Sequence, residues 1–481
     1  MTWWQEGVLY QVYVRSFADS NGDGIGDLPG LTSRLDYLEW LGVDALWLNP
    51  TFPSPNEDWG YDVADYYGVH PDFGTLDDLD WLVAEAGRRG IRILLDLVPN
   101  HTSDRHPWFL GEHRDWYVWA ERPTNWRAVF GGSAWEWDEQ AGRYYLHSFL
   151  PEMPDLNWHV PAVREEFDRI LRYWFDRGIA GFRVDVVHRT VKDLRLRDAT
   201  RRGRVERFPP TDVPATHDLI RSWRRLADAY DAPRLLIGET YVRDVGEMAS
   251  FYGAEADELQ LAFNFPFVHA PLSAAGLRRI VELTEQALPA AAWPVWTLSN
   301  HDHVRFPTRL CDGDERKIRC ALLLLLALRG TPVLYYGDEL GMEEGPAPDP
   351  PLDRARPPRD GCRTPMPWDG GPPAVTWLPH GDLSRSLETE RTDADSLLSL
   401  CRDLIALRRG FAGEPYATLP AGPGVWAWRR GSTTVAVNLS QRSAHVRHVD
   451  GVVRISTDRS RDGERVSGRL RLDPWSGAVV E

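Results

Sequence analysis

The sequence predicts an α/β protein. We expect a (β/α)8 TIM barrel with a small domain inserted after the third strand and a C-terminal antiparallel β-sandwich. Short apolar, β-branched runs alternate eight times with amphipathic helical stretches, which is the pattern of a parallel sheet covered by helices on both faces. Residues 102–160 interrupt this rhythm, and residues 412–481 change to alternating β patterns separated by turns.

The eight strand–helix units follow one another in chain order, and eight such units favour a closed barrel. The predicted strands are "VLYQVYVRSF", "ALWLNP", "RILLDLVPN", "AGFRVDVV", "PRLLIGET", "LQLAFNFPF", "VWTLSNHD" and "TPVLYYGDE". The predicted helices are "LTSRLDYLEWLG", "LDDLDWLVAEAGRRG", "REEFDRILRYWFDRG", "HDLIRSWRRLADAY", a short one after "GETYV", "GLRRIVELTEQAL", "KIRCALLLLLAL" and "LLSLCRDLIALRRG". The run "CALLLLLALRG" is too short to span a bilayer, so we expect a buried helix there.

The breaks in the rhythm define the predicted domains. Residues 1–101 and 161–411 are the two parts of the barrel. Residues 102–160, rich in Trp, Gly and Pro, are too long for a βα loop and are expected to form an inserted domain. Residues 412–481 are expected to form the sandwich, and residues 341–395 a long ordered loop before the last barrel helix.

The charge balance limits the classes of partner. A formal net charge of −16 over 481 residues disfavours nucleic acid and anionic membranes, which both demand a positive face. The one strongly basic stretch, residues 191–208, is expected to be a solvated surface, with contact to an anionic part of a substrate as the alternative. Four cysteines without metal-ligand spacing, and no visible signal peptide, favour the cytoplasm.

Polar residues cluster where the predicted strands end, which is where barrel enzymes carry their catalytic groups. Arg183 and Asp185 lie two apart on the fourth strand, so both side chains point to one face. Glu239 ends the fifth strand. The remaining polar residues at these ends are Asp96, Asn100 and His101 on the third strand and Asn300, His301 and Asp302 on the seventh. The acids Asp185, Glu239 and Asp302, together with two histidines and an arginine at one barrel mouth, predict a catalytic site.

The motifs that carry these residues resemble those of a known family. "DLVPNH", "GFRVDVVH", "IGET" and "SNHD", with "MPDLNW" in the inserted segment, are similar to the short motifs of the α-amylase superfamily of glycoside hydrolases, in the same order. The similarity runs along the whole chain and is strongest to the branch of oligo-1,6-glucosidases and other α-glucosidases. The resemblance implies an exo-acting retaining α-glucosidase that hydrolyses α-1,4 or α-1,6 bonds of short α-glucosides.

The same resemblance implies a division of labour at the site. Asp185 would be the nucleophile, kept ionised by Arg183, and Glu239 the general acid and then the base. The two carboxyl groups of a retaining glycosidase are expected about 5–5.5 Å apart. Asp302 would complete the catalytic acids. The residues that would hold the terminal glucose are His301, His101 and Tyr61. No metal would take part in bond cleavage.

Further positions bear on substrate size and linkage. In these relatives an Asp before "GYD" pairs with an Arg in an "RTP" segment and closes the glucose pocket, and the matching residues are Asp58 and Arg363. Val186 is of the residue type associated with α-1,6 bonds, whereas Met153 stands where oligo-1,6-glucosidases carry Gln. These two cues conflict, so both linkages stay open. Phe130 and Phe149 are expected on the aglycone side.

The segment "DSNGDGIGD" offers a ring of oxygens. It looks like an EF-hand loop, but Gly30 stands at the position of the bidentate Glu, and the preceding segment is predicted to be a strand. In the resembled family this segment follows the first barrel strand and binds a structural Ca²⁺, or sometimes Mg²⁺. The implied ligands are Asp19, Asn21, Asp23, the carbonyl of Ile25, and Asp27.

Two alternatives to hydrolysis stay open. A transglucosidase or an isomerase, of the trehalose- or isomaltulose-forming type, would use the same site and differ in how well water is excluded. A non-catalytic barrel that serves as a transporter accessory chain would lack the acids and carry a membrane anchor, whereas Asp185, Glu239 and Asp302 are present. Small α-glucosides are the only partners expected, with the chain a monomer or a homodimer.

Overall fold

The computed structural model describes residues 1–199, 211, 213–369 and 375–481. Its centre is an eight-stranded parallel sheet, in the order β10-β11-β1-β2-β3-β7-β8-β9, that curls into the predicted (β/α)8 barrel. The barrel strands are β1 (Leu9–Val12), β2 (Ala45–Leu48), β3 (Arg92–Leu97), β7 (Gly181–Val184), β8 (Leu235–Gly238), β9 (Leu261–Ala262), β10 (Val295–Thr297) and β11 (Thr331–Tyr335). Their residues are almost all buried, which fits a sheet covered on both faces.

Helices follow every barrel strand. The longer ones are α4 (Leu35–Leu41), α5 (Leu76–Arg88), α6 (Pro161–Asp176), α7 (Val213–Asp228), α10 (Ala274–Ala287), α12 (Glu315–Ala327) and α14 (Leu397–Arg408). The shorter ones are α1 (Trp3–Glu6), α2 (Val14–Phe17), α3 (Leu28–Ser33), α8 (Val245–Ser250), α9 (Phe265–Val268), α11 (Phe306–Cys311) and α13 (Leu387–Glu390). The expected buried helix is α12, whose residues from Ile318 to Ala327 are buried apart from Arg319. No helix of the described residues combines the length and apolar character needed to cross a bilayer.

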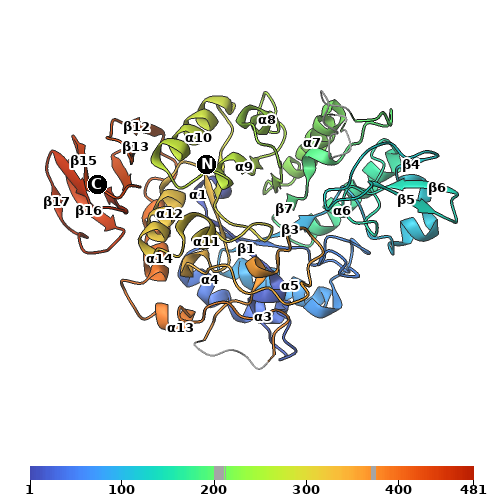
Figure 1. The fold of residues 1–481 in the computed structure, drawn as a ribbon, viewed down its shortest axis with the longest axis horizontal. Coiled ribbons are helices and arrows are strands. Elements are labelled where there is room, and N and C mark those ends of the chain that lie inside the picture. The colour runs from blue at the N-terminus through green and yellow to red at the C-terminus, as the bar shows by residue number, and fades with distance from the viewer. Residues whose placement is uncertain (200–210, 212, 370–374) are drawn as a thin grey trace.

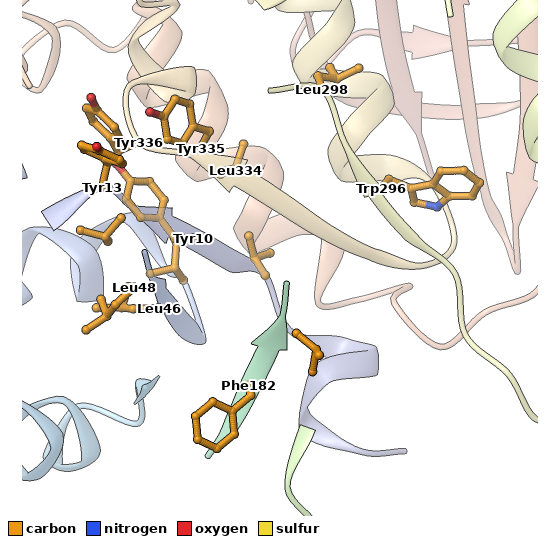
Figure 2. Packing of buried hydrophobic residues seen from close by; sticks show 14 of the residues in the cluster. Tyr10, Tyr13, Leu46, Leu48, Phe182, Trp296, Leu298, Leu334, Tyr335 and Tyr336 are labelled. Carbon is orange, nitrogen blue, oxygen red and sulfur yellow. The ribbon is translucent and has the colours of Figure 1, made fainter. Parts of the chain in front are cut away.

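The first predicted strand is wrong in its second half. Only Leu9–Val12 pair with β2 and β11, whereas Val14–Phe17 form one helical turn. An apolar segment of this kind is compatible with a buried helical turn as well as with a strand, and all four residues of α2 are buried. Figure 2 shows Tyr10 and Tyr13 beside Tyr335 and Tyr336 at the end of β11.

Two β structures lie on opposite sides of the barrel, along the longest axis of the molecule (Figure 1). Within residues 102–160, a three-stranded sheet is formed by β4 (Trp119–Ala120), β6 (Arg143–Leu146) and β5 (Trp135–Asp138). At the C-terminus, a six-stranded sheet packs with a two-stranded one to form the sandwich. Its strands are β12 (Tyr416–Leu419), β13 (Val425–Arg430), β14 (Thr433–Asn438), β15 (Ala444–Arg447), β16 (Gly451–Ser456), β17 (Arg465–Val466), β18 (Arg469–Leu472) and β19 (Ser476–Val480).

Candidate active site

The candidate site lies at the carboxyl ends of the barrel strands, as predicted. Asp96 and Arg183 are register partners on the adjacent strands β3 and β7. Asp185 directly follows β7, and Glu239 directly follows β8, which pairs with β7. Three neighbouring strands therefore bring these four side chains together, although the residues lie far apart in the sequence.

Arg183 is the centre of this cluster. Its guanidinium lies 2.8 Å from Asp96 Oδ1, 2.6 Å from Asp185 Oδ1 and 2.7 Å from Glu239 Oε2. Arg183 is 2% exposed and also lies over the ring of Trp47. One buried cation thus holds three carboxylates. The expected separation of the Asp185 and Glu239 carboxyl groups stays a prediction, but both groups contact the same guanidinium.

The pKa of Asp185 is set by opposing contributions. Burial raises the pKa of Asp185 well above its ordinary value, and Glu239 and Asp96 act in the same direction. Arg183 lowers the pKa, as expected, but burial outweighs it. Burial likewise raises the pKa of Asp96 to about 6. The expected effect of Arg183 on the Asp185 carboxyl group is thus present, but burial and the neighbouring acids act against it.

Val186 holds Glu239 from the other side. Its backbone N–H donates to Glu239 Oε2 at 3.0 Å. Val186 has φ 33° and ψ 41°, in the left-handed region that β-branched residues rarely adopt. This costly conformation turns the chain directly after Asp185 so that the Val186 amide faces the second acid.

His101, Tyr61 and His301 lie together beside this cluster. The rings of Tyr61 and His301 are parallel, with centroids 5.4 Å apart, and Tyr61 Oη lies 2.7 Å from His301 Nε2. Tyr61 also donates to Asp96 Oδ2. His101 Nε2 lies 3.2 Å from the Tyr61 carbonyl, and burial lowers the pKa of His101 to about 4. The histidines are therefore neutral hydrogen-bonding groups at neutral pH.

Asp302 differs from Asp185 in the direction of its pKa shift. It lies 2.9 Å from Arg359 Nη1 and 3.3 Å from both Arg363 Nη2 and His301 Nε2. Burial opposes the charge on Asp302, but these groups outweigh it and hold the pKa well below its usual range. At 24% side-chain exposure, Asp302 is the most accessible of the three predicted catalytic acids.

The predicted ion pair of Asp58 has the wrong partner. Asp58 pairs with Arg359, whereas Arg363 pairs with Asp302 and donates from Nε to the His301 carbonyl at 2.9 Å. Arg359 in turn makes a bidentate pair with Asp353, at 2.7 and 2.8 Å. Arg359 therefore joins Asp58, Asp302 and Asp353 in one network, which the sequence reading missed.

Aromatic rings border this network. Phe130 and Phe149 are in ring contact at 5.7 Å, Phe149 also contacts His101, and the Arg359 guanidinium lies over Phe130. Met153 is 1% exposed and packs in the main apolar cluster. The two phenylalanines thus lie between the barrel-mouth histidine and the arginine network.

The chain matches the family model described as "Alpha amylase, catalytic domain" over residues 11–412. It belongs to the α-amylase family of glycoside hydrolases. The chain is 39% identical to a probable α-glucosidase of Rhizobium meliloti (strain 1021), covering 85% of this chain and 82% of the relative. It is 32% identical to the oligo-1,6-glucosidase of Parageobacillus thermoglucosidasius, covering 100% and 99%. The solved structure of an isomaltulose synthase from Klebsiella sp. LX3 superposes with a TM-score of 0.92 at 31% identity, covering 100% and 99%.

The basic stretch of this α-amylase-family chain begins inside the protein. Lys192 is 1% exposed, donates to Asn100 Oδ1 and to the Arg189 carbonyl, and lies 3.2 Å from Asp155 Oδ2. The expectation of a solvated surface is thus wrong for Lys192, although Arg195 and Arg197 are exposed and pair with Asp193. Residues 200–208 of the stretch lie outside the described residues.

The predicted calcium loop of this α-amylase-family chain is closed by its own hydrogen bonds. Asp19 accepts from the amides of Asn21, Gly22 and Gly24, and Asp23 accepts from the Ile25 amide. Asp27 caps α3 through the Gly30 amide. The described residues contain no group of three or more His, Cys, Asp or Glu side chains placed to hold a metal. The oxygen donors match the chemistry of Ca²⁺. Asp19, Asn21 and Asp23 are exposed, whereas Asp27 is buried.

The opposite pKa shifts of Asp185 and Asp302 predict opposite effects on stability. A raised folded pKa gives stability that is complete below the unfolded pKa of about 3.9 and is lost as pH rises. Asp185→Asn is therefore expected to raise the thermal unfolding midpoint by a few degrees at about pH 7.5, and by less at about pH 4.5.

Asp302→Asn is the matched control for that experiment. The lowered pKa of Asp302 gives stability that is present above the unfolded pKa and is lost as pH falls. This variant should unfold at a lower temperature than the parent chain near neutral pH, with the gap closing in acid. Equal shifts of the two variants in scanning calorimetry would contradict the opposite pKa shifts of Asp185 and Asp302.

Proposed function

We propose that this α-amylase-family chain is an exo-acting retaining α-glucosidase of short α-1,4- or α-1,6-linked glucosides. The observation that carries the proposal is the placement of Asp185 and Glu239 on one guanidinium, next to the Arg359 network. Relatives named as a probable α-glucosidase and an oligo-1,6-glucosidase support the same reading. The four buried free cysteines are compatible with the proposed cytoplasmic location.

In the proposed reaction Asp185 attacks the anomeric carbon and Glu239 donates its proton to the departing glycosidic oxygen. Glu239 then takes a proton from water, whose oxygen displaces Asp185 and restores both acids. The cycle requires an ionised Asp185 and a protonated Glu239, and acids gathered around Arg183 that share a proton can start with one ionised and one protonated member. His101, Tyr61, His301 and Asp302 would hold the hydroxyl groups of the terminal glucose.

The Arg359 network supports an exo mode of action. Arg359 ties together Asp58, from the loop after β2, and Asp302, from the loop after β10. We propose that this link closes the site behind the terminal glucose, so that the interior of a polymer cannot pass. Phe130 and Phe149 would contact the aglycone on the opposite side.

Transfer to a sugar acceptor, or isomerisation, is the second candidate. The likeness to an isomaltulose synthase over the full chain favours keeping it. The site acids would be the same, and the outcome would depend on whether water or a sugar reaches the glucosyl–Asp185 intermediate. Product analysis on maltose, isomaltose and sucrose separates the two, because an isomerase yields a rearranged disaccharide and a hydrolase yields free glucose.

The two acids should respond differently to substitution. Asp185→Asn is expected to retain less than about a thousandth of the parent kcat. Glu239→Gln should lose maltose hydrolysis but keep much of the first step with α-glucosyl fluoride, because fluoride leaves without protonation. Asp193→Asn, whose carboxylate pairs with the exposed Arg195, is the control and should stay active.

Stereochemistry gives the second readout for the two acids. NMR of the first turnover should show α-glucose, as retention requires. Release of β-glucose, or substantial activity of a folded Asp185→Asn variant, would contradict the proposed mechanism.

Arg359→Met should weaken the selection for short substrates. Losing the link between Asp58 and Asp302 is expected to reduce kcat/KM for maltose by about 100-fold and to reduce the preference for maltose over long α-glucans. The control is Arg354→Met, because Arg354 is 42% exposed and pairs with Glu57 and Glu152. An unchanged ratio of maltose to glucan activity in Arg359→Met would refute the closing role.

We also propose that the loop of Asp19, Asn21 and Asp23 binds one structural Ca²⁺, with Mg²⁺ as the alternative ion. The ion would supply only a fixed positive charge that orders this loop. Calcium at about 100 times its Kd should stabilise the parent chain by about 2.7 kcal/mol, seen as a higher unfolding midpoint than in a chelator. Asp23→Ala should lose this shift while kcat stays unchanged. A calcium-induced shift of the same size in Asp23→Ala would rule out this loop.

A further inference from the structure

Gln11 on β1 has a buried side-chain amide that contacts His301, one of the candidate site residues. It is fully buried, and its Nε2 lies 2.8 Å from Asn49 Oδ1 and 2.8 Å from His301 Nδ1. These partners come from the ends of two other strands, β2 and β10. None of the chemistry assigned above uses Gln11, so its two contacts need another explanation.

The ring of His301 is held in one orientation. Tyr61 lies parallel to it, at an interplanar angle of 4°. Tyr13 stacks at 6.2 Å, and Trp47 meets the ring edge-on at 6.1 Å. A ring packed between these three aromatic side chains cannot turn over without displacing them. Each of its two nitrogens therefore has fixed neighbours.

Those neighbours determine which nitrogen carries the proton. An amide nitrogen only donates, so His301 Nδ1 must accept from Gln11 Nε2. On the opposite side, Nε2 lies 3.3 Å from Asp302 Oδ2, and an ionised carboxylate only accepts. Tyr61 donates its own proton to Asp96 Oδ2 and accepts from Asn49 Nδ2, and the second lone pair of its oxygen can accept from Nε2. Both sides of the ring thus specify a neutral imidazole with hydrogen on Nε2.

The charges around the ring agree with a neutral state. Burial lowers the pKa of His301 well below its ordinary value, and Arg363, Arg183 and Arg359 act in the same direction against Asp302. If Nδ1 carried a second proton, two N–H groups would face each other, and the hydrogen bond from Gln11 Nε2 to Nδ1 would be lost.

We propose that Gln11 is a positioning residue that holds His301 as the neutral Nε2–H tautomer, with the N–H directed at Asp302 and Tyr61. On the proposed function, this hydrogen belongs to the group that grips the terminal glucose. His301 then supplies a donor beside the ionised Asp302, which supplies acceptors, so one sugar hydroxyl can be held from both sides. A reversed tautomer would place a lone pair opposite the carboxylate and weaken both contacts.

Two variants of nearly equal size test this role. Gln11→Glu replaces the donor with an acceptor and should draw a proton onto Nδ1. Gln11→Met removes both hydrogen bonds but leaves Asp302 and Tyr61 to specify Nε2–H. The chain is labelled with ¹⁵N-histidine, and the signal of His301 among the 14 histidines is identified by its loss in His301→Gln. Protonated and unprotonated ring nitrogens have well-separated ¹⁵N shifts, so the tautomer is read without any activity.

The parent chain and Gln11→Met should show an unprotonated Nδ1, and Gln11→Glu a protonated one. Gln11→Glu should also lose at least about tenfold more kcat/KM than Gln11→Met. A purely structural role predicts the opposite order, because Gln11→Met loses more hydrogen bonds. A protonated Nδ1 in the parent chain, or an unprotonated one in Gln11→Glu, would overturn the proposal. The NMR result stands even if the glucosidase assignment fails, and the parent spectrum decides if a variant does not fold.

Discussion

The contact of Arg183 with three buried carboxylates is the constraint on which the site depends. A lone carboxylate in the barrel mouth would carry a desolvation cost of several kcal/mol. Asp96, Asp185 and Glu239 share one cation, and the remaining imbalance appears as the raised pKa values of Asp96 and Asp185. The parallel strands β3, β7 and β8 make this sharing geometrically possible, because their carboxyl ends lie side by side.

The second network solves a different electrostatic problem. Around Arg359, the cation meets Asp58, Asp302 and Asp353, and Arg363 adds a second positive charge. The pKa of Asp302 is consequently lowered, although it lies in the same barrel mouth as Asp185. Two arginine-centred clusters thus shift the pKa values of carboxyl groups in one site in opposite directions, because burial outweighs the cation in one cluster and the cations outweigh burial in the other.

Much of the barrel, and the members of the site, could be predicted from the sequence. The apolar runs before Asp185 and Glu239 are long and periodic, so the strands that place these acids could be located. The partner of Asp58 could not, because Arg359 and Arg363 lie one turn apart and only the folded loop decides which one reaches Asp58. The turn at Val14–Phe17 escaped prediction because burial of a short apolar segment looks the same in a strand and in a helix.

Lys192 and Gln11 show why the environment of a single polar residue is hard to predict from the sequence. Lys192 begins a run that reads as solvated, yet its ammonium group is buried against Asp155 and Asn100, both remote in the sequence. Gln11 sits inside an apolar strand, where a polar residue is costly unless both ends of its amide are used. Its nitrogen is used twice, on Asn49 and His301, while its oxygen has no partner among the described residues. The unpaired oxygen costs stability, and the proposed role of the amide nitrogen in fixing the tautomer of His301 accounts for the presence of Gln11 in this strand.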